Sequence, residues 1–178
     1  MLTEFKKTIC LTAILMLAYC HGYSQPKSVG VTFAVTGFSL SYEHSLDNDS
    51  FIDVGFKAKM DEVFSGRGKY PGGSTYVLWN MIFAEKETTT GNKIRFFAGP
   101  GATAGYCADF KRPPGPVFGL SGSLGMECMF DRNVQLSLSI NPILGAHISV
   151  FDDHLSMKLY RSGLIYSLIP EIGIKYMF

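Results

Sequence analysis

The sequence lacks the patterns that mark several common classes of protein. Charged residues make up 17% of the 178 positions, and Lys and Arg form no cluster of the kind that a phosphate-binding surface needs. No spacing of Cys, His and carboxylates resembles a metal site, and no break in composition separates two domains. We therefore expect a single domain with no nucleic-acid partner, no metal and no cofactor.

Long apolar runs are also missing, apart from one at the start. The stretch "MLTEFKKTICLTAILMLAYCHGYSQ" has two lysines and then an apolar run from Ile9 to Tyr19. This run is shorter than the roughly 18 residues that a spanning helix needs. Gly22 and Ser24 have the spacing of a cleavage site. We predict a cleaved secretory signal over residues 1–24 and a mature domain over residues 25–178.

The N-terminus has two alternative interpretations, an uncleaved membrane anchor and a lipoprotein that begins at Cys20. The lipoprotein is disfavoured because Tyr19 is bulky where a small residue is expected. Of the four cysteines, Cys10 and Cys20 leave with the signal. We expect Cys107 and Cys128 to lie too far apart to bridge, so the cysteines do not indicate a disulfide framework.

Helical periodicity is absent after the signal, and alternation with a period of two recurs instead. In "VQLSLSINPILGAHISV", for example, Val134, Leu136 and Leu138 share one face, whereas Gln135 and Ser137 share the other. Other segments repeat this two-faced pattern. The alternation predicts an all-β protein with one apolar and one polar face.

The first of these segments, "VGVTFAVTGFSLSYEHS", changes the phase of its alternation near Gly37. A two-residue hairpin requires such a change and would pair Phe33 with Leu40 and Val31 with Tyr42. A bulge at Gly37 within one long strand is the alternative. The hairpin gives an even number of strands, which is what bacterial outer-membrane barrels have.

With the hairpin, the sequence predicts an eight-stranded antiparallel up-and-down transmembrane β-barrel. Its connections alternate between short and longer ones, as expected for periplasmic turns and external loops. The expected strands lie near residues 28–35, 38–45, 51–60, 74–86, 93–108, 116–130, 134–150 and 163–178.

The C-terminal segment "EIGIKYMF" is the most specific motif. Together with the architecture of residues 28–178, it resembles the small bacterial outer-membrane β-barrel proteins of the OmpA/OmpX-like class. In that class a terminal strand with this pattern is the assembly signal, here Glu171, Gly173, Tyr176 and Phe178. The resemblance implies residence in the outer membrane of a Gram-negative bacterium and contact with its insertion machinery.

The polar faces of the predicted strands carry equal numbers of acids and bases. An inverted, soluble barrel is the alternative fold, but it would have to place these charges elsewhere. Inside an eight-stranded barrel there is room only for side chains, so the charges are expected to pair and plug the lumen. A selective pore is the alternative, although it would need a ring of one sign. The expected lumen charge network contains Glu43, Asp53, Lys57, Lys59, Arg95, Glu127, Glu171 and Lys175.

An enzymatic alternative rests on His147 and Ser149, since outer-membrane lipid deacylases use a His-x-Ser pair with a distal Glu. With a last hairpin turning near residue 157, Glu171 would lie on the order of 13 Å from His147, which is too far for a catalytic hydrogen bond. We therefore expect a monomeric, non-enzymatic barrel in the lipid bilayer, which serves envelope structure or binds an unknown external ligand through its loops.

Overall fold

The computed structural model describes residues 26–60, 72–89, 91–109, 112–130, 133–151 and 154–178. The predicted signal sequence and its cleavage site lie outside these residues.

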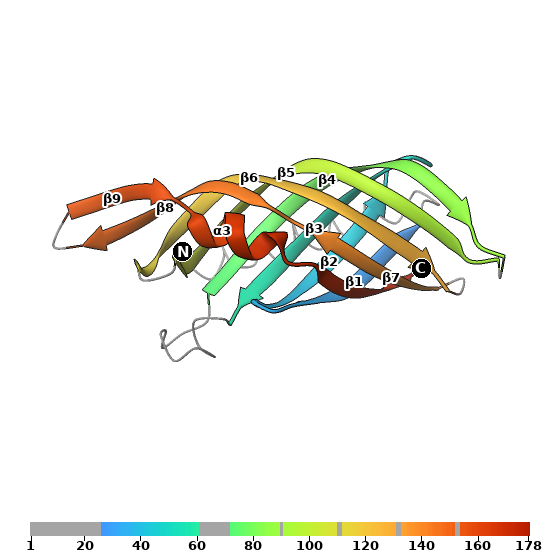
Figure 1. Ribbon diagram of the computed structural model, residues 1–178, viewed down its shortest axis with the longest axis horizontal. Helices are drawn as coiled ribbons and strands as arrows, with labels where there is room; N and C mark the ends of the chain where they lie inside the picture. Colours follow the sequence, from blue (N-terminus) through green and yellow to red (C-terminus); the bar gives the residue numbers. More distant parts are fainter. Residues whose placement is uncertain (1–25, 61–71, 90, 110–111, 131–132, 152–153) are drawn as a thin grey trace, which may run out of the picture.

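The described chain consists almost entirely of strands (Figure 1). Two short helical segments, α3 and η2, precede the last strand. In chain order the elements are β1 (Lys27–Ala34), β2 (Gly37–Ser45), β3 (Ser50–Lys59), β4 (Gly72–Glu87), β5 (Lys93–Asp109), β6 (Arg112–Met129), β7 (Val134–Ile140), β8 (Ile143–Phe151), β9 (His154–Leu159), α3 (Arg161–Ile165), η2 (Tyr166–Leu168) and β10 (Glu171–Met177).

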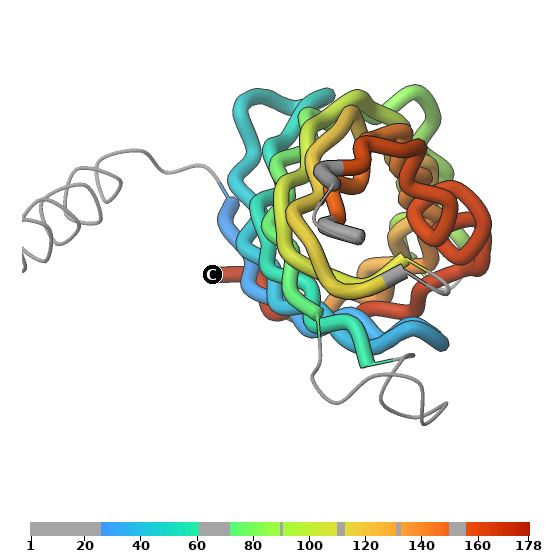
Figure 2. Tube along the Cα trace, turned by 90° about the vertical axis from the view of Figure 1, so that its left-hand side faces the viewer, coloured from blue at the N-terminus to red at the C-terminus, as the bar shows by residue number. Residues whose placement is uncertain are grey.

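Antiparallel pairing closes the sheet into a ring. Strands β1 to β6 pair in sequence, β6 pairs with β7, β7 with β10, and β10 with β1. Figure 2 shows this ring end-on. The predicted eight-stranded antiparallel barrel is confirmed.

The two ends of the barrel differ. One end holds Lys27, Phe178 and the short connections 46–49, 88–92 and 130–133, and we call it the terminal end. The other holds the connections 35–36, 60–71, 110–111 and 152–153, and we call it the loop end. The two strands that close the ring therefore have their chain ends at the terminal end: β1 begins there and β10 finishes there.

Side chains alternate between the two surfaces of the wall, as the period-two pattern predicts. In β10, Ile172 and Ile174 are 59% and 53% exposed, whereas Glu171 and Lys175 are 3% and 4% exposed. The same alternation runs through β2, β3 and β7. Apolar side chains thus cover the outside of the ring, and polar ones fill the inside.

The first hairpin is confirmed, but its register differs from the predicted one by two residues. Phe33 pairs with Phe38 and Val31 with Leu40, and the turn consists of Val35 and Thr36. A shift of two keeps every side chain on its expected face. Gly37 begins β2 with a positive φ of 150°, where a Cβ would lie only 1.9 Å from the carbonyl oxygen of Ala58.

The predicted strand over residues 134–150 is interrupted at Asn141 and Pro142. Proline has no N–H with which to continue the ladder. The carbonyl of Pro142 accepts a hydrogen bond from the N–H of Gly122 at 2.9 Å, and the N–H of Asn141 donates to the carbonyl of Ser167 at 3.1 Å. The seventh position of the wall therefore consists of two strands, β7 and β8, which both pair with β6.

The prediction of a strand over residues 163–178 is wrong for the first half of that range. Residues 161–168 form α3 and η2, and β10 starts only at Glu171. Before the helix, β9 pairs with β8 in a hairpin that was expected to be a loop. The expected loop after Asp109 is also mostly strand, because β6 already begins at Arg112.

Helix α3 lies in the wall of the barrel (Figure 2). Its first turn is held by Asp109 of β5, whose carboxylate accepts the N–H of Ser162 at 2.8 Å. Leu164 and Ile165 are exposed outward, whereas Gly163 is buried, and a Cβ there would lie 2.3 Å from the ring of Tyr160. Among the described residues, no helix has the length and apolar character needed to cross a bilayer.

Candidate functional site

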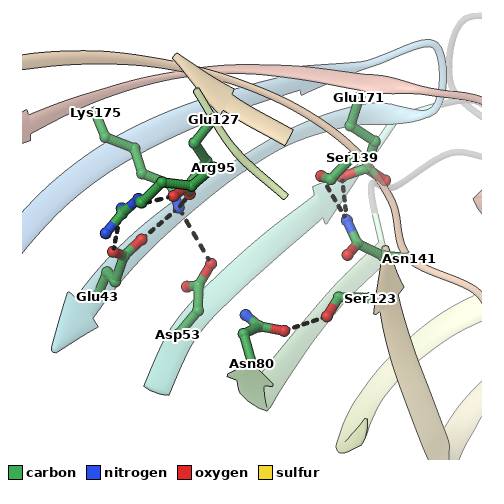
Figure 3. A network of polar contacts seen from close by, with 10 residues as sticks. All are labelled: Glu43, Asp53, Asn80, Arg95, Ser123, Glu127, Ser139, Asn141, Glu171 and Lys175. Atoms are coloured by element: carbon green, nitrogen blue, oxygen red, sulfur yellow. Dashed lines mark hydrogen bonds and ion pairs between the residues drawn. The ribbon is translucent and has the colours of Figure 1, made fainter. Parts of the chain in front are cut away.

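The lumen near the terminal end contains a buried lysine between two glutamates (Figure 3). The Nζ of Lys175 on β10 lies 2.6 Å from Oε2 of Glu43 on β2 and 2.8 Å from Oε1 of Glu127 on β6. All three side chains are at least nine-tenths buried. A buried charge is tolerated only with such partners, so Lys175 links three strands through the interior.

Two further charged side chains extend this cluster. The Nη2 of Arg95 on β5 lies 2.8 Å from Glu127 and 3.7 Å from Glu43. An oxygen of Asp53 on β3 lies 3.8 Å from the Nζ of Lys175. We call these five residues, from five different strands, the charge network: Glu43, Asp53, Arg95, Glu127 and Lys175.

An aromatic side chain that the sequence analysis missed packs against the charge network. Phe51 is 1% exposed, and its ring makes an edge-to-face contact with Phe97 at 5.4 Å. The Nζ of Lys175 lies 5.7 Å from the centroid of Phe51, within reach of a cation–π interaction. Phe51 lies two residues before Asp53, so both side chains point inward. The alternation of the sequence could therefore have predicted that Phe51 faces the lumen.

A second group of polar contacts lies in the middle of the lumen. Lys57 of β3 forms an ion pair with Glu171 of β10. The amide of Asn141 donates to the other oxygen of Glu171 at 3.2 Å. The interruption between β7 and β8 therefore directs the Asn141 side chain into the lumen, where it helps hold Glu171 (Figure 3).

A third group lies toward the loop end and is centred on Tyr160, which the sequence analysis did not single out. Tyr160 is 2% exposed, and its hydroxyl accepts a hydrogen bond from Lys59 and lies 3.2 Å from the Sγ of Cys107. The ring of His147 stacks against it at 6.3 Å. The alternation of the sequence could not predict that Tyr160 faces the lumen, because this residue lies between β9 and α3, where the alternation is interrupted.

The possible catalytic residues do not come together. His147 pairs with Lys158, because the last hairpin turns between Phe151 and His154 and not near residue 157 as predicted. Glu171 pairs with Ser139, eight residues along the wall from His147, or about 26 Å at strand rise. His147 and Ser149 are buried, and the Nε2 of His147 lies 3.0 Å from the carbonyl oxygen of Cys107.

The cysteines are far apart, as the sequence indicates. Cys107 on β5 pairs with Gly115 on β6, and Cys128 lies thirteen residues further along β6, about 43 Å at strand rise. A disulfide requires Cα atoms within about 7 Å. Within the described part of the chain, no three His, Cys, Asp or Glu side chains are grouped to hold a metal ion.

The residues of the C-terminal motif divide between the two faces of β10. Glu171 and Gly173 face inward, and a Cβ on Gly173 would lie 2.4 Å from the hydroxyl of Ser137. Tyr176 and Phe178 face outward and are 52% and 61% exposed. The backbone of Phe178 exchanges two hydrogen bonds with Lys27, which seals the ring at the terminal end.

An apolar exterior around a closed ring with charged side chains inside is the arrangement of a membrane-spanning barrel. Water is absent from the bilayer core, so only a closed ring can satisfy the backbone of a spanning sheet. The chain folds as a small outer-membrane β-barrel. Bacterial barrels of this kind span the outer membrane, and the apolar exterior of this barrel places it there.

No family model matches the sequence of this barrel, and no curated protein matches it. Similar solved structures include Ail, the attachment invasion locus protein of Yersinia pestis, in complex with the heparin analogue sucrose octasulfate. That match has 15% identity and a TM-score of 0.40, and it covers 88% of this chain and 100% of Ail. Neisserial surface protein A has 14% identity and a TM-score of 0.43, with 86% and 94% covered. The likeness is one of fold alone.

Proposed function

We propose that the protein is a non-enzymatic, monomeric barrel of the outer membrane, with a lumen sealed by ion pairs and a loop end that binds partners outside the cell. The single observation that supports the seal is the position of Lys175, which is 4% exposed and contacts carboxylates from two other strands. An eight-stranded barrel encloses only enough space for side chains. Paired charges of both signs close that space without making a pore selective for one sign.

The orientation follows from the connections. Barrels of this type have short turns in the periplasm and longer loops outside. The terminal end has only short connections, whereas the loop end has the connection over residues 60–71. The loop end therefore faces the exterior. The C-terminal motif of Glu171, Gly173, Tyr176 and Phe178 then runs toward the periplasmic side and ends there with Phe178, where the insertion machinery would bind it.

A planar bilayer tests the seal directly. The purified wild-type barrel is expected to give no steady single-channel current carried by potassium or chloride ions, because the charge network closes the terminal half of the lumen to them. A triple variant, Glu43→Gln, Glu127→Gln and Lys175→Met, removes most of that network. Its matched control is Glu85→Gln with Lys93→Met, which removes an exposed ion pair near the β4–β5 connection. Steady potassium or chloride current through the wild-type protein would contradict the proposal.

Binding at the loop end is favoured by the shape of the β8–β9 hairpin, which projects beyond the rest of the barrel (Figure 1). Strand β9 ends the sheet order and pairs with β8, and a strand at the edge of a sheet can take up an incoming extended segment. Met157 and Leu159 of β9 are exposed. Peptides selected on the wild-type barrel should lose binding to a Met157→Lys, Leu159→Lys variant but keep binding to a Lys93→Met variant.

The absence of catalysis is supported by the separation of His147 from Glu171 and by the engagement of both side chains. Glu171 pairs with Lys57 and Asn141. A lipid-modifying enzyme would need its nucleophile, base and orienting acid within hydrogen-bond reach of one another. Incubation of the barrel with phospholipid and lipopolysaccharide, followed by mass spectrometry of the lipids, is expected to show no protein-dependent product.

A further inference from the structure

Beside its charges, the lumen carries many small hydroxyl side chains. These side chains are short, so they leave room that long charged ones would fill. Serines and threonines from six different strands face the interior and are buried, among them Thr32, Ser39, Ser74, Thr103, Ser121 and Ser137.

Three small cavities lie between these side chains, one after another. The loop cavity, of about 10 Å³, borders Lys59 and Tyr160. The middle cavity, of about 20 Å³, borders Ser121. The network cavity, of about 20 Å³, borders Asp53 and Lys175. Each has the volume that one water molecule needs, roughly 10–15 Å³.

Neighbouring cavities share the side chains that line them. Lys57, Ser74 and Thr103 border both the loop cavity and the middle cavity. Tyr76, Leu78 and Asn141 border both the middle cavity and the network cavity. The three cavities therefore form a file along the lumen, from Tyr160 near the loop end to the charge network.

Two polar atoms that line the file have no hydrogen-bond partner among the described residues. They are the hydroxyl of Ser121, at the middle cavity, and Oδ1 of Asp53, at the network cavity. Both residues are at least nine-tenths buried. Buried polar atoms are satisfied by protein or by ordered water, and a polar cavity of this size beside such an atom is where a buried water lies.

The polar path continues from Asp53 toward the terminal end. The side-chain oxygen and nitrogen of Gln135 and the hydroxyl of Ser28 are also buried without a partner among the described residues. Gln135 pairs with Lys175 across the β7–β10 ladder, and Ser28 pairs with Glu43 across the β1–β2 ladder. Groups that need water thus lie on both sides of the charge network.

We propose that the lumen holds a file of single water molecules, one in each cavity, and that this file carries protons but no hydrated ions through the barrel. In each step a water accepts a proton from one neighbour and donates another to the next, so only O–H bonds break and form. At the end of the file the carboxylate of Asp53 accepts the proton and releases it to a water that satisfies Ser28 or Gln135 on the terminal side. Asp53 is the carboxylate at the end of the file. Asp53 pairs with Glu43 across the β2–β3 ladder, and its other oxygen lies 3.8 Å from the Nζ of Lys175, whose charge keeps the site from attracting a free cation.

The proposal rests on the sealed lumen, and vesicles test the two ideas separately. The barrel is refolded into phosphatidylcholine vesicles that contain the pH dye pyranine, with potassium and valinomycin to clamp the potential. After an acid step, the interior should acidify faster than in protein-free vesicles. Without valinomycin, potassium and chloride leakage should equal that of protein-free vesicles.

Ser121→Val fills the middle cavity and should return proton entry to the protein-free rate. Ser41→Val is the matched control, because Ser41 is a buried lumen serine that borders none of the three cavities. It should keep the wild-type rate. Ser121→Ala, which folds more readily, should lower the rate because the relay loses a hydroxyl.

Several outcomes would contradict the proposed file of water molecules. They are a wild-type proton rate equal to that of empty vesicles, an equal loss in Ser121→Val and Ser41→Val, or an unchanged rate in Ser121→Ala. A high-resolution crystal structure without a water at about 2.7–3.2 Å from the Ser121 hydroxyl would do so too. Ion leakage through the wild-type barrel would instead contradict the seal.

Discussion

The terminal half and the loop half of the barrel wall are built differently. In the terminal half, β1, β10 and β7 pair along unbroken ladders, and the charge network joins five strands from inside. In the loop half, the seventh position is interrupted at Pro142, and a helix occupies part of the eighth. There the wall depends on contacts of individual side chains, such as Asp109 with the start of α3.

The difference teaches that a barrel wall can be closed by two kinds of interaction. Backbone ladders satisfy every N–H and C=O within the sheet, as a spanning segment requires. A helix satisfies them within itself, so it can replace part of a strand if side chains hold it in place. Variants that remove one kind of interaction should therefore affect one half more than the other.

The largest effect is expected for Lys175→Met in the terminal half. The change leaves Glu43, Glu127 and Asp53 buried together without their central cation. Breaking a buried ion pair typically costs about 3–5 kcal/mol of unfolding free energy. Urea unfolding in detergent micelles measures the loss. Lys93→Met, which removes an exposed pair with Glu85, should cost at most about 1 kcal/mol. Equal losses in the two variants would contradict the role given to the charge network.

A smaller effect is expected for Asp109→Ala in the loop half. This change leaves the N–H groups of Arg161 and Ser162 without the carboxylate that accepts them. Loss of a helix cap costs about 0.5–2 kcal/mol. Hydrogen exchange should rise in residues 161–168 and remain low in β10, because the terminal half is held separately. Faster exchange throughout β10 would show that the two halves are one cooperative unit.

The smallest effect on stability is expected for Phe178→Ala. The side chain is 61% exposed, so it contributes little burial in detergent. If the terminal aromatic is recognised by the insertion machinery, the variant should accumulate unfolded in the periplasm and still refold in detergent at nearly the wild-type yield. Val35→Ala, at an exposed apolar site of the loop end, is the control for general loss of lipid contact. A refolding defect in detergent would assign Phe178 to stability instead.

The alternation of the sequence predicted the faces of β2, β3, β7 and β10 correctly, because one side of each strand meets lipid and the other meets the lumen. It placed Glu43 and Lys175 on the inward face. It did not reveal that the Glu43 and Lys175 side chains contact each other. Which inward side chains of different strands come into contact depends on the stagger of all the strands in the barrel. Phe51 was not predicted to face the lumen, although it lies two residues from Asp53 and so has the same position in the alternation.

Residues 163–170 show where alternation was insufficient. Their apolar residues fit a strand, and a strand was predicted. The helix is decided by contacts from elsewhere in the chain, namely the cap from Asp109 and the close packing of Gly163 on Tyr160. Such contacts are non-local, so a pattern within ten residues cannot contain them. Tertiary context overrides local preference in short segments of this kind.

The pairing of β1 with β10 has a consequence for biosynthesis. These are the first and last strands of the described chain, so the wall has two open edges until β10 has emerged from the export channel. Open edges are templates for aggregation. A chain halted by a premature stop codon or cut by a protease before residue 171 would keep both edges, and no partial ring could hide them. We therefore expect an unfinished polypeptide to aggregate unless its strand edges are covered until the final segment arrives.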